Sequence, residues 1–420
     1  MKNNKALNIL LALVYYAALN FVLYVYIGEL FEYYHFKSEF NLAKTLISIA
    51  TIVSFYTFFN SSNLVLAFSH LLYALMLVPT LSIFSVGGAG YNFYFVSVLS
   101  IFIVVFFATY YKPKTIKAYE IDTNLILRCL FTMCLVYICA IIALGGLKHL
   151  NFNLSKVYEV REEASSILPS YFGYISPIIG KVAIPLMIVI AAVKKKWSYL
   201  VSGIGFSILI FGFTAHRSPL IYPFIILCIY YLPWRNLPTL ILLGCISICL
   251  LSALDFFWMV ETDNPFAGWF GSLFSRRALL VPANLNNVYI EFFAQNEVYY
   301  WAASKFSLGL SESPYHLPYI NLIGYEYYGD SEITANTGWI GAGYANARLF
   351  GTMFYSILLG VLIAFMAAIG EKVGQKFMFS ASFVTIMTLI LSTDFSTAIL
   401  THGLLALLFI LMFIKKDSLS

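Results

Sequence analysis

Long apolar runs separated by short polar segments follow one another along almost the whole chain. A helix that crosses a hydrocarbon core about 30 Å thick needs roughly 20 such residues. Eight runs have about this length: Leu7–Ile27, Leu42–Phe59, Leu64–Val86, Tyr91–Tyr111, Leu125–Gly146, Tyr171–Val193, Leu237–Phe257 and Leu349–Gly370. Each run is predicted to be one transmembrane α-helix.

Two further apolar stretches, Trp197–Leu232 and Phe377–Ile414, are too long for one crossing. As single helices they would each exceed 50 Å, at about 1.5 Å per residue. Polar residues interrupt the first stretch at His216–Pro219 and the second at Asp394 and Ser396. Each stretch is therefore predicted to be a hairpin of two short helices, which brings the expected number of spans to twelve.

Composition supports the same class of protein. The chain has 420 residues, of which 61% are hydrophobic and only 11% charged, and its mean hydropathy is +0.83. Soluble proteins carry about 25% charged residues, so a cytosolic enzyme is excluded. The six cysteines all lie inside apolar runs, where we expect neither disulfides nor a metal site. The predicted fold class is an all-α polytopic integral membrane protein.

The basic residues predict the orientation of the chain in the membrane. With a cytoplasmic N-terminus, every lysine cluster falls on one side, as the positive-inside rule requires. These residues are Lys112, Lys114, Lys117, Lys194, Lys195, Lys196, Arg235, Lys372, Lys376, Lys415 and Lys416. The net charge of +5 thus belongs to cytoplasmic loops, and nucleic acid is not expected as a partner.

This orientation divides the chain into three parts and places both termini in the cytoplasm. Residues 1–257 hold nine expected spans and an extracytoplasmic loop at 148–170. Residues 258–344 form a large extracytoplasmic loop, rich in aromatic residues and expected to fold over the outer membrane face. Residues 345–420 hold the last three spans.

Arginines are distributed differently from lysines. Five of the seven fall on the outer side: Arg161, Arg217, Arg276, Arg277 and Arg348. An outer site has no access to cytoplasmic nucleotides, and Walker A and Rossmann glycine patterns are absent from the sequence. A lipid pyrophosphate carries its own activation, and the planar guanidinium group pairs with phosphate oxygens in bidentate fashion. We therefore expect these arginines to bind pyrophosphate.

Structural readings compete with this hypothesis. Arg161 could be a solvated loop charge, Arg217 could snorkel to the interface, and Arg276 and Arg277 could pair with Glu291 or Glu297. A general base for a sugar hydroxyl could be His316 or one of eight loop carboxylates. These carboxylates are Glu261, Asp263, Glu291, Glu297, Glu312, Glu326, Asp330 and Glu332.

Two short motifs leave alternatives open. Glu261–Asp263 has the look of a metal-binding acidic pair, although so short a pattern is weak, and no metal is expected. The glycine-rich segment Asn336–Asn346 precedes a span. Its glycines could bring backbone close to a ligand or form an anion-binding nest, or the segment could simply be a re-entry loop.

Taken together, several of these segments resemble the O-antigen polymerase (oligosaccharide repeat-unit polymerase) family in order and loop placement. They are Tyr158–Arg161, Arg217–Pro219, Ser275–Arg277 through Pro282, Ile323–Gly329 and Asn336 onward. The resemblance covers about residues 158–351. It implies a C-type membrane glycosyltransferase on the outer face of the bacterial inner membrane, which joins undecaprenyl-pyrophosphate-linked repeat units into O-antigen or a related surface polysaccharide.

The resemblance also implies roles for individual residues and partners. Arg276, Arg277 and Arg217 are expected at the catalytic site, and Arg161 is expected to hold pyrophosphate with them. Arg348, also a candidate for substrate binding, stands where we expect a glycine near the start of the re-entering helix, and it could contact a further phosphate or a sugar. The remaining candidates for substrate binding are His316, Glu326 and Asn336. The expected partners are the lipid-linked oligosaccharide, membrane lipid and a chain-length regulator (polysaccharide co-polymerase), with no cofactor.

Two other functions remain open from the sequence. An O-antigen ligase would transfer glycan to a lipid A core by related chemistry. A flippase for lipid-linked oligosaccharide would place cations in a central cavity, and Arg128 and Lys181 are the plain mid-chain candidates. Because most outer basic residues gather at one face, the enzyme is favoured over the transporter.

Overall fold

The computed structural model is built almost entirely from helices. It describes residues 4–58, 63–114, 120–152, 169, 171–262, 267–302, 304, 307 and 309–414. Over these residues no β-strand forms, and the β-type pairing consists of isolated bridges, Glu39 with Gly87 and Ile121 with Ile414. The chain divides into two compact units: unit 1 comprises 1–112, 233–364 and 389–396, and unit 2 comprises 113–232, 365–388 and 397–420.

Unit 1 begins with the first four apolar runs of the sequence. Its N-terminal elements are α1 (Lys5–Val22), η1 (Leu23–Ile27), α2 (Gly28–Leu30), η2 (Glu32–Tyr34), α3 (Leu42–Phe58), α4 (Asn63–Leu72), η3 (Tyr73–Leu77), α5 (Val78–Ser85) and α6 (Tyr91–Tyr110). Its later elements are η6 (Trp234–Asn236), α13 (Leu237–Thr262), α14 (Trp269–Gly271), η7 (Ser272–Leu280), α15 (Val281–Gln295), α16 (Tyr319–Tyr328) and most of α17 (Trp339–Val373).

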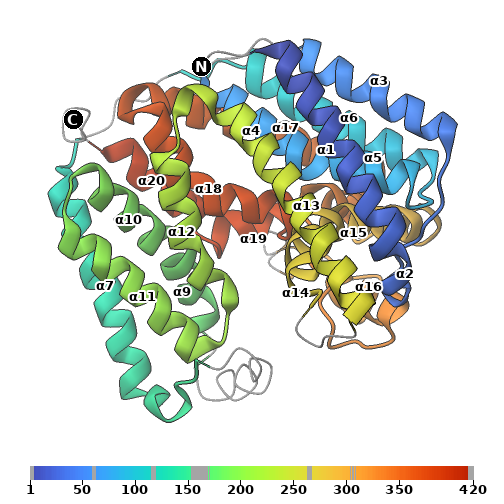
Figure 1. Cartoon of the computed structure of the whole chain (residues 1–420). Helices are drawn as coiled ribbons and strands as arrows, with labels where there is room; N and C mark the ends of the chain where they lie inside the picture. The colour runs from blue at the N-terminus through green and yellow to red at the C-terminus, as the bar shows by residue number, and fades with distance from the viewer. Residues whose placement is uncertain are drawn as a thin grey trace. The chain divides into compact units, whose positions relative to one another are not determined.

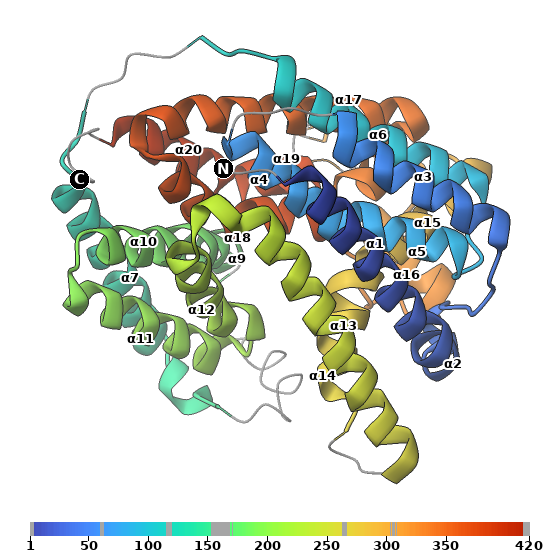
Figure 2. The ribbon, with the colours of Figure 1, turned by 45° about the horizontal axis from the view of Figure 1, so that its top comes forward.

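The core of unit 1 is the continuous helix Leu64–Ser85, formed by α4, η3 and α5. Its most apolar window is completely buried, because α3, α6, α13 and the Arg276-bearing element η7 surround it. The helix α1 packs along α13, as Figure 2 shows for the dark blue and yellow helices. The central helix Leu64–Ser85 is apolar on all sides, as expected of a helix that is buried on all sides.

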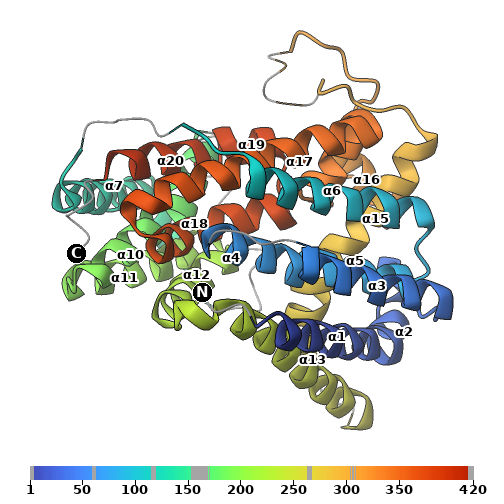
Figure 3. The same cartoon turned by 90° about the horizontal axis from the view of Figure 1, so that it is seen from above.

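The segment expected as one folded loop at 258–344 is largely helical. α14, η7 and α15 form one continuous helical stretch, Trp269–Gln295, which packs against α5, α6 and α13. Figure 3 shows α15 and α16 together at one end of the unit 1 helices. The segment therefore belongs to the same compact unit as the N-terminal helices.

A sharp kink divides α17. Ala347 and Arg348 have non-helical backbone angles, and Arg348 has a φ of 48°. The chain folds back here, so that the carbonyl oxygen of Gly343 contacts Gly351. A methyl group on Gly343 would lie only 2.7 Å from Cα of Thr352, which explains the glycine. The expected span Leu349–Gly370 begins directly after this kink.

Unit 2 is a second helical bundle. Its elements are α7 (Thr123–Ala143), η4 (Gly146–His149), α9 (Phe172–Ile178), η5 (Ile179–Ala183), α10 (Ile184–Val193), α11 (Trp197–Thr214), α12 (Arg217–Tyr231), α18 (Gln375–Leu391), α19 (Phe395–Leu400) and α20 (Leu404–Phe413), with α18 and α19 each crossing a unit boundary. The apolar helix α10 is buried and packs against α7, α11 and α12; Figure 1 shows α10, α11 and α12 side by side in green.

Eight helices in the described ranges are long and apolar enough to cross a membrane, which confirms an all-α protein with membrane-spanning helices. The other four expected spans correspond to shorter apolar helices: Leu42–Thr57, Arg217–Tyr231, Gln375–Leu391 and Leu404–Phe413. Both expected hairpin breaks are present, since α11 ends at Thr214 before α12 begins at Arg217, and α18 ends at Leu391 before α19 begins at Phe395.

Candidate functional site in unit 1

Arg276 lies in the nine-residue π-helical element η7 and is only 7% exposed. Widened π-helical turns often occur at functional sites. The next residue, Arg277, is exposed. Neighbouring residues on a helix do not face each other, so the two guanidinium groups have different surroundings. Arg276 is the one that the fold holds inside.

The surroundings of Arg276 fix the orientation of its guanidinium group. Its Nε and Nη2 donate hydrogen bonds to Oγ of Ser272, at 3.1 and 2.7 Å. Its Cζ lies 4.4 Å from the ring centre of Phe31 and 5.1 Å from that of Tyr34, which is within range of cation–π attraction. We call Arg276, Ser272, Phe31 and Tyr34 the Arg276 site.

Two hydrogen bonds attach the helix that carries Arg276 to α13. The backbone N–H of Gly271 donates to Oδ2 of Asp255 at 2.9 Å, and Oγ of Ser275 donates to Oγ of Ser252 at 2.7 Å. A carboxylate close to the first turn of a helix is favourable because it faces the positive end of the helix dipole. Asp255, which the sequence did not single out, is therefore a positioning residue for Arg276.

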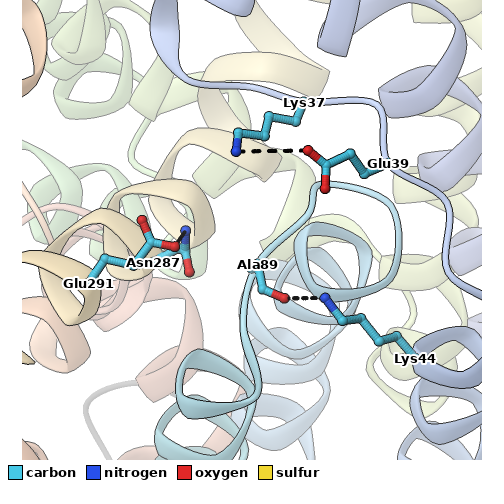
Figure 4. A network of polar contacts seen from close by, with 6 residues as sticks. All are labelled: Lys37, Glu39, Lys44, Ala89, Asn287 and Glu291. Carbon is cyan, nitrogen blue, oxygen red and sulfur yellow. Dashed lines mark hydrogen bonds and ion pairs between the residues drawn. The ribbon is translucent and has the colours of Figure 1, made fainter.

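Amide side chains continue along α15 beyond Arg276. Nδ2 of Asn284 donates to the carbonyl oxygen of Tyr34 at 3.4 Å, and Nδ2 of Asn287 donates to Oε1 of Glu291 at 2.9 Å. Figure 4 shows Asn287 and Glu291 with the ion pair of Lys37 and Glu39. Oδ1 of Asn287 is a buried acceptor without a hydrogen-bond partner among the described residues. Such amides and carboxylates suit the recognition of sugar hydroxyls.

Tyrosines of α16 pack on the turn that carries Tyr34. His35 has a left-handed backbone, with a φ of 60°, and its Nε2 lies 2.7 Å from the carbonyl oxygen of Tyr327. The rings of Tyr34 and Tyr328 are 5.9 Å apart. Burial, followed by the neighbouring Tyr34 and Tyr327, raises the pKa of Tyr328 to about 12, so its hydroxyl remains protonated. These contacts close one side of the Arg276 site.

The other candidates in unit 1 have surroundings that indicate structural roles or solvent exposure. Nε of Arg348 donates to the carbonyl oxygen of Phe293 at 3.0 Å, so this guanidinium caps the end of α15. Nδ2 of Asn336 donates to Oγ1 of Thr334 at 3.1 Å. His316 and Glu326 are exposed.

Protein atoms surround glycines of the segment Asn336–Asn346. Gly338 lies against the carbonyl oxygen of Ile390, and Gly341 against Thr337 and Asn286. Oδ1 of Asn286 also accepts hydrogen bonds from Thr337 Oγ1 at 2.9 Å and from Gly341 N at 3.0 Å. These glycines thus serve close packing, which favours the re-entry loop over a ligand-binding nest.

Arg217 belongs to unit 2, where it begins α12 and is half-buried. Arg161 and Asp263 lie outside the described residues, and Glu261 is exposed near the end of α13. Across the described part of the chain, no three His, Cys, Asp or Glu side chains come together in a group that could hold a metal ion.

A buried carboxylate, Asp394, was identified in the sequence only as a helix break. Its Oδ1 accepts a hydrogen bond from the hydroxyl of Tyr355 at 2.9 Å, and its Oδ2 accepts from N of Ser396 at 2.9 Å and from Oγ of Ser396. The Tyr355 hydroxyl in turn accepts from Nε1 of Trp301 at 3.0 Å. Asp394 thus caps α19 and joins it to α17 and the Trp301 segment.

The fold and the Arg276 site define the class as a multi-helix membrane protein with a buried cation in unit 1. No family model, curated protein or solved structure matches the chain.

Proposed function

We propose that the protein is a membrane glycosyltransferase that polymerises undecaprenyl-pyrophosphate-linked oligosaccharide repeat units on the outer face of the bacterial inner membrane. The observation that supports this most is the Arg276 site: a buried guanidinium held by two aromatic rings and a serine, on a helix that continues into buried amides. A fixed cation of this kind suits a leaving pyrophosphate.

The chemistry uses the energy of the lipid pyrophosphate. The bond between the anomeric carbon of the growing glycan and the pyrophosphate oxygen breaks, and an acceptor sugar hydroxyl forms the new glycosidic bond. Negative charge develops on the departing pyrophosphate, where Arg276 stabilises it without reorganisation. The proton of the acceptor hydroxyl leaves to a base. No nucleotide sugar takes part.

The proposal needs Arg276 at the outer end of the helices and the lysine-rich segments at the cytoplasmic end, and contacts within each unit support this orientation. In unit 1, Nζ of Lys5 donates to the carbonyl oxygen of Thr57 at 3.2 Å at one end of α1, whereas Arg276 stacks on Phe31 beyond the other end. In unit 2, Lys372 pairs with Glu120 at 3.4 Å, so expected cytoplasmic segments gather there too. Under the positive-inside rule, we infer that the Arg276 end of unit 1 faces outward. The proposal also takes the eight long and four shorter apolar helices as twelve spans.

The test is a reconstitution with one substrate. Purified protein in lipid vesicles receives an undecaprenyl-pyrophosphate-linked repeat unit alone, and products are separated by length. The proposal expects a ladder of glycans that differ by one repeat unit. If the lipid is bound but no ladder forms, the polymerase assignment fails.

The same vesicles separate the two alternatives. A ligase gives product only when lipid A core is added. A flippase moves the lipid-linked unit between leaflets and leaves its chemical structure unchanged, so mass analysis of the recovered lipid distinguishes transport from transfer.

A further inference from the structure

A π-helical turn and a helix break of unit 2 meet at a lysine and a histidine. Lys181 lies in the π-helical element η5, between α9 and α10. His402 lies in the break between α19 and α20. Nζ of Lys181 and Nδ1 of His402 are 3.1 Å apart, and both side chains are half-buried. The two residues are 221 positions apart in the sequence, so only the fold brings them together.

The break at His402 is packed directly on η5. Gly403 has a φ of 78°, and a methyl group there would lie 2.7 Å from Cγ2 of Val182. The N–H groups of Thr401 and His402 both donate to the carbonyl oxygen of Thr397, at 2.9 Å each, which ends α19. Glycine and this shared acceptor therefore hold His402 against Lys181.

The start of α12 reaches the same place. A methyl group on Gly180 would lie 3.8 Å from Cγ of Pro219, so the residue before Lys181 contacts the first turn of α12. Arg217 begins that helix two residues before Pro219. The first turn of α12, which Arg217 begins, thus lies against η5 beside the contact of Lys181 and His402.

This neighbourhood lies deep along its helices. Lys181 is 12 residues before Val193 and 9 residues after Phe172, which corresponds to about 18 Å and about 14 Å at 1.5 Å per residue. Arg217 is 14 residues before Tyr231, or about 21 Å. In a hydrocarbon core about 30 Å thick, these depths are well inside the membrane.

A cation at that depth is costly and usually marks a functional site. Within the described part of the chain, no carboxylate forms an ion pair with Lys181, and its hydrogen-bond partner is the ring of His402. An ammonium group has three donors and no acceptor, so a charged Lys181 donates to Nδ1 of His402 in this contact. This bond also prevents Lys181 from snorkelling to the interface. The site has positive charge that an anion would neutralise.

We propose that Lys181 and His402 form an anion-binding site in unit 2 that takes a phosphate group of a lipid-linked substrate. Discontinuous helices at membrane depth are a recurrent setting for substrate and ion sites, and the break between α19 and α20 is of this kind. The π-helical turn that carries Lys181 is also a common feature of functional sites. A catalytic role for this anion-binding site rests on the proposed function. Each extension step of that function needs a donor lipid and an acceptor lipid, so each unit would hold one pyrophosphate.

The test counts bound lipid. Full-length protein in nanodiscs of zwitterionic lipid is mixed with undecaprenyl phosphate, and bound molecules per chain are measured by native mass spectrometry. Lys181→Gln keeps a hydrogen-bond donor for His402 but removes the charge. We expect the wild type to bind two lipids, and Lys181→Gln to weaken one of them about tenfold or more, because a charge-assisted phosphate contact is lost.

Matched variants control for folding and for general charge. Lys181→Arg restores a cation and should retain the second lipid. Arg128→Met removes an exposed cation from α7 of the same unit and should change nothing. If Lys181→Gln elutes and melts like the wild type and still binds two lipids with unchanged affinity, the inference is wrong.

Two further arms identify the source of the anion and separate this inference from the proposed function. In the first arm, inorganic pyrophosphate competes with undecaprenyl phosphate for the site. If it displaces the lipid only at much higher concentration, the ligand is a lipid phosphate. If the site binds inorganic pyrophosphate and not the lipid, the assignment of a lipid ligand is wrong. Arg276→Met should remove the other lipid. If it does not, while Lys181→Gln still removes one, the Arg276 site fails and the Lys181–His402 site stands.

Discussion

Replacing Arg276 by lysine is the most informative single change in the protein. Lysine keeps the charge but loses the planar fork that donates to Ser272 at 3.1 and 2.7 Å and stacks on Phe31 at 4.4 Å. Because Arg276 is only 7% exposed, water cannot replace these contacts easily. The change therefore tests geometry while the charge is held constant.

The expected loss follows from the contacts that lysine cannot make. Lysine can still make a cation–π contact, but it has no second donor nitrogen fixed in the same plane. A hydrogen bond to a charged group contributes about 1.5–3 kcal/mol. If about 3 kcal/mol of this acts on the leaving pyrophosphate, the rate falls roughly a hundredfold, since about 1.4 kcal/mol corresponds to a factor of ten. We therefore expect extension by Arg276→Lys to be slower by one to three orders of magnitude.

The assay is the initial rate of repeat-unit extension in vesicles at equal amounts of inserted protein. Arg235→Lys is the matched control, because this arginine is exposed and lies between α12 and α13. Circular dichroism and a melting curve show whether the variant is folded. A folded Arg276→Lys protein that extends glycans within about threefold of the wild-type rate would refute the claim that the planar guanidinium group, and not charge alone, stabilises the leaving pyrophosphate.

Four other substitutions test the fold and its orientation. Gly343→Ala places a methyl group 2.7 Å from Cα of Thr352 and should cost about 1–3 kcal/mol, seen as a lower melting temperature; an unchanged melting temperature would contradict the packing at the α17 kink. Arg348→Ala removes the cap on the end of α15 and should lower stability by about 1 kcal/mol in a denaturant titration, whereas equal stability would mean that the cap contributes nothing. A cysteine introduced at exposed Glu312 should react with an impermeant maleimide in intact cells, and one at Lys195 only after permeabilisation; the reverse pattern would invert the proposed topology.

The sequence was sufficient to predict the helical class and several of its interruptions. Apolar length alone located the apolar helices, and polar residues at His216 and Asp394 marked real helix breaks. Arg348, singled out as an unexpected charge, lies at the kink of α17. A charge or a proline inside an apolar run is visible locally, and that is why these positions could be found.

Contacts between distant residues could not be predicted. Arg276 and Arg277 are equivalent in the sequence, and only the rotation of η7 makes one buried and the other exposed. Likewise, Lys181 and His402 come from separate apolar runs, 221 positions apart. The helical stretch Trp269–Gln295 was also missed, because its asparagines give no clean apolar stripe until α5, α6 and α13 surround it.

The central claim is that, for each glycosidic bond that it forms, the protein breaks one bond between a glycan and its lipid pyrophosphate. Undecaprenyl pyrophosphate released into vesicles can be counted against the repeat units joined in the same sample. The account predicts one released molecule per new linkage, with no lipid A core or nucleotide sugar present. Linkages without release, or lipid that crosses the membrane without any release or linkage, would contradict it.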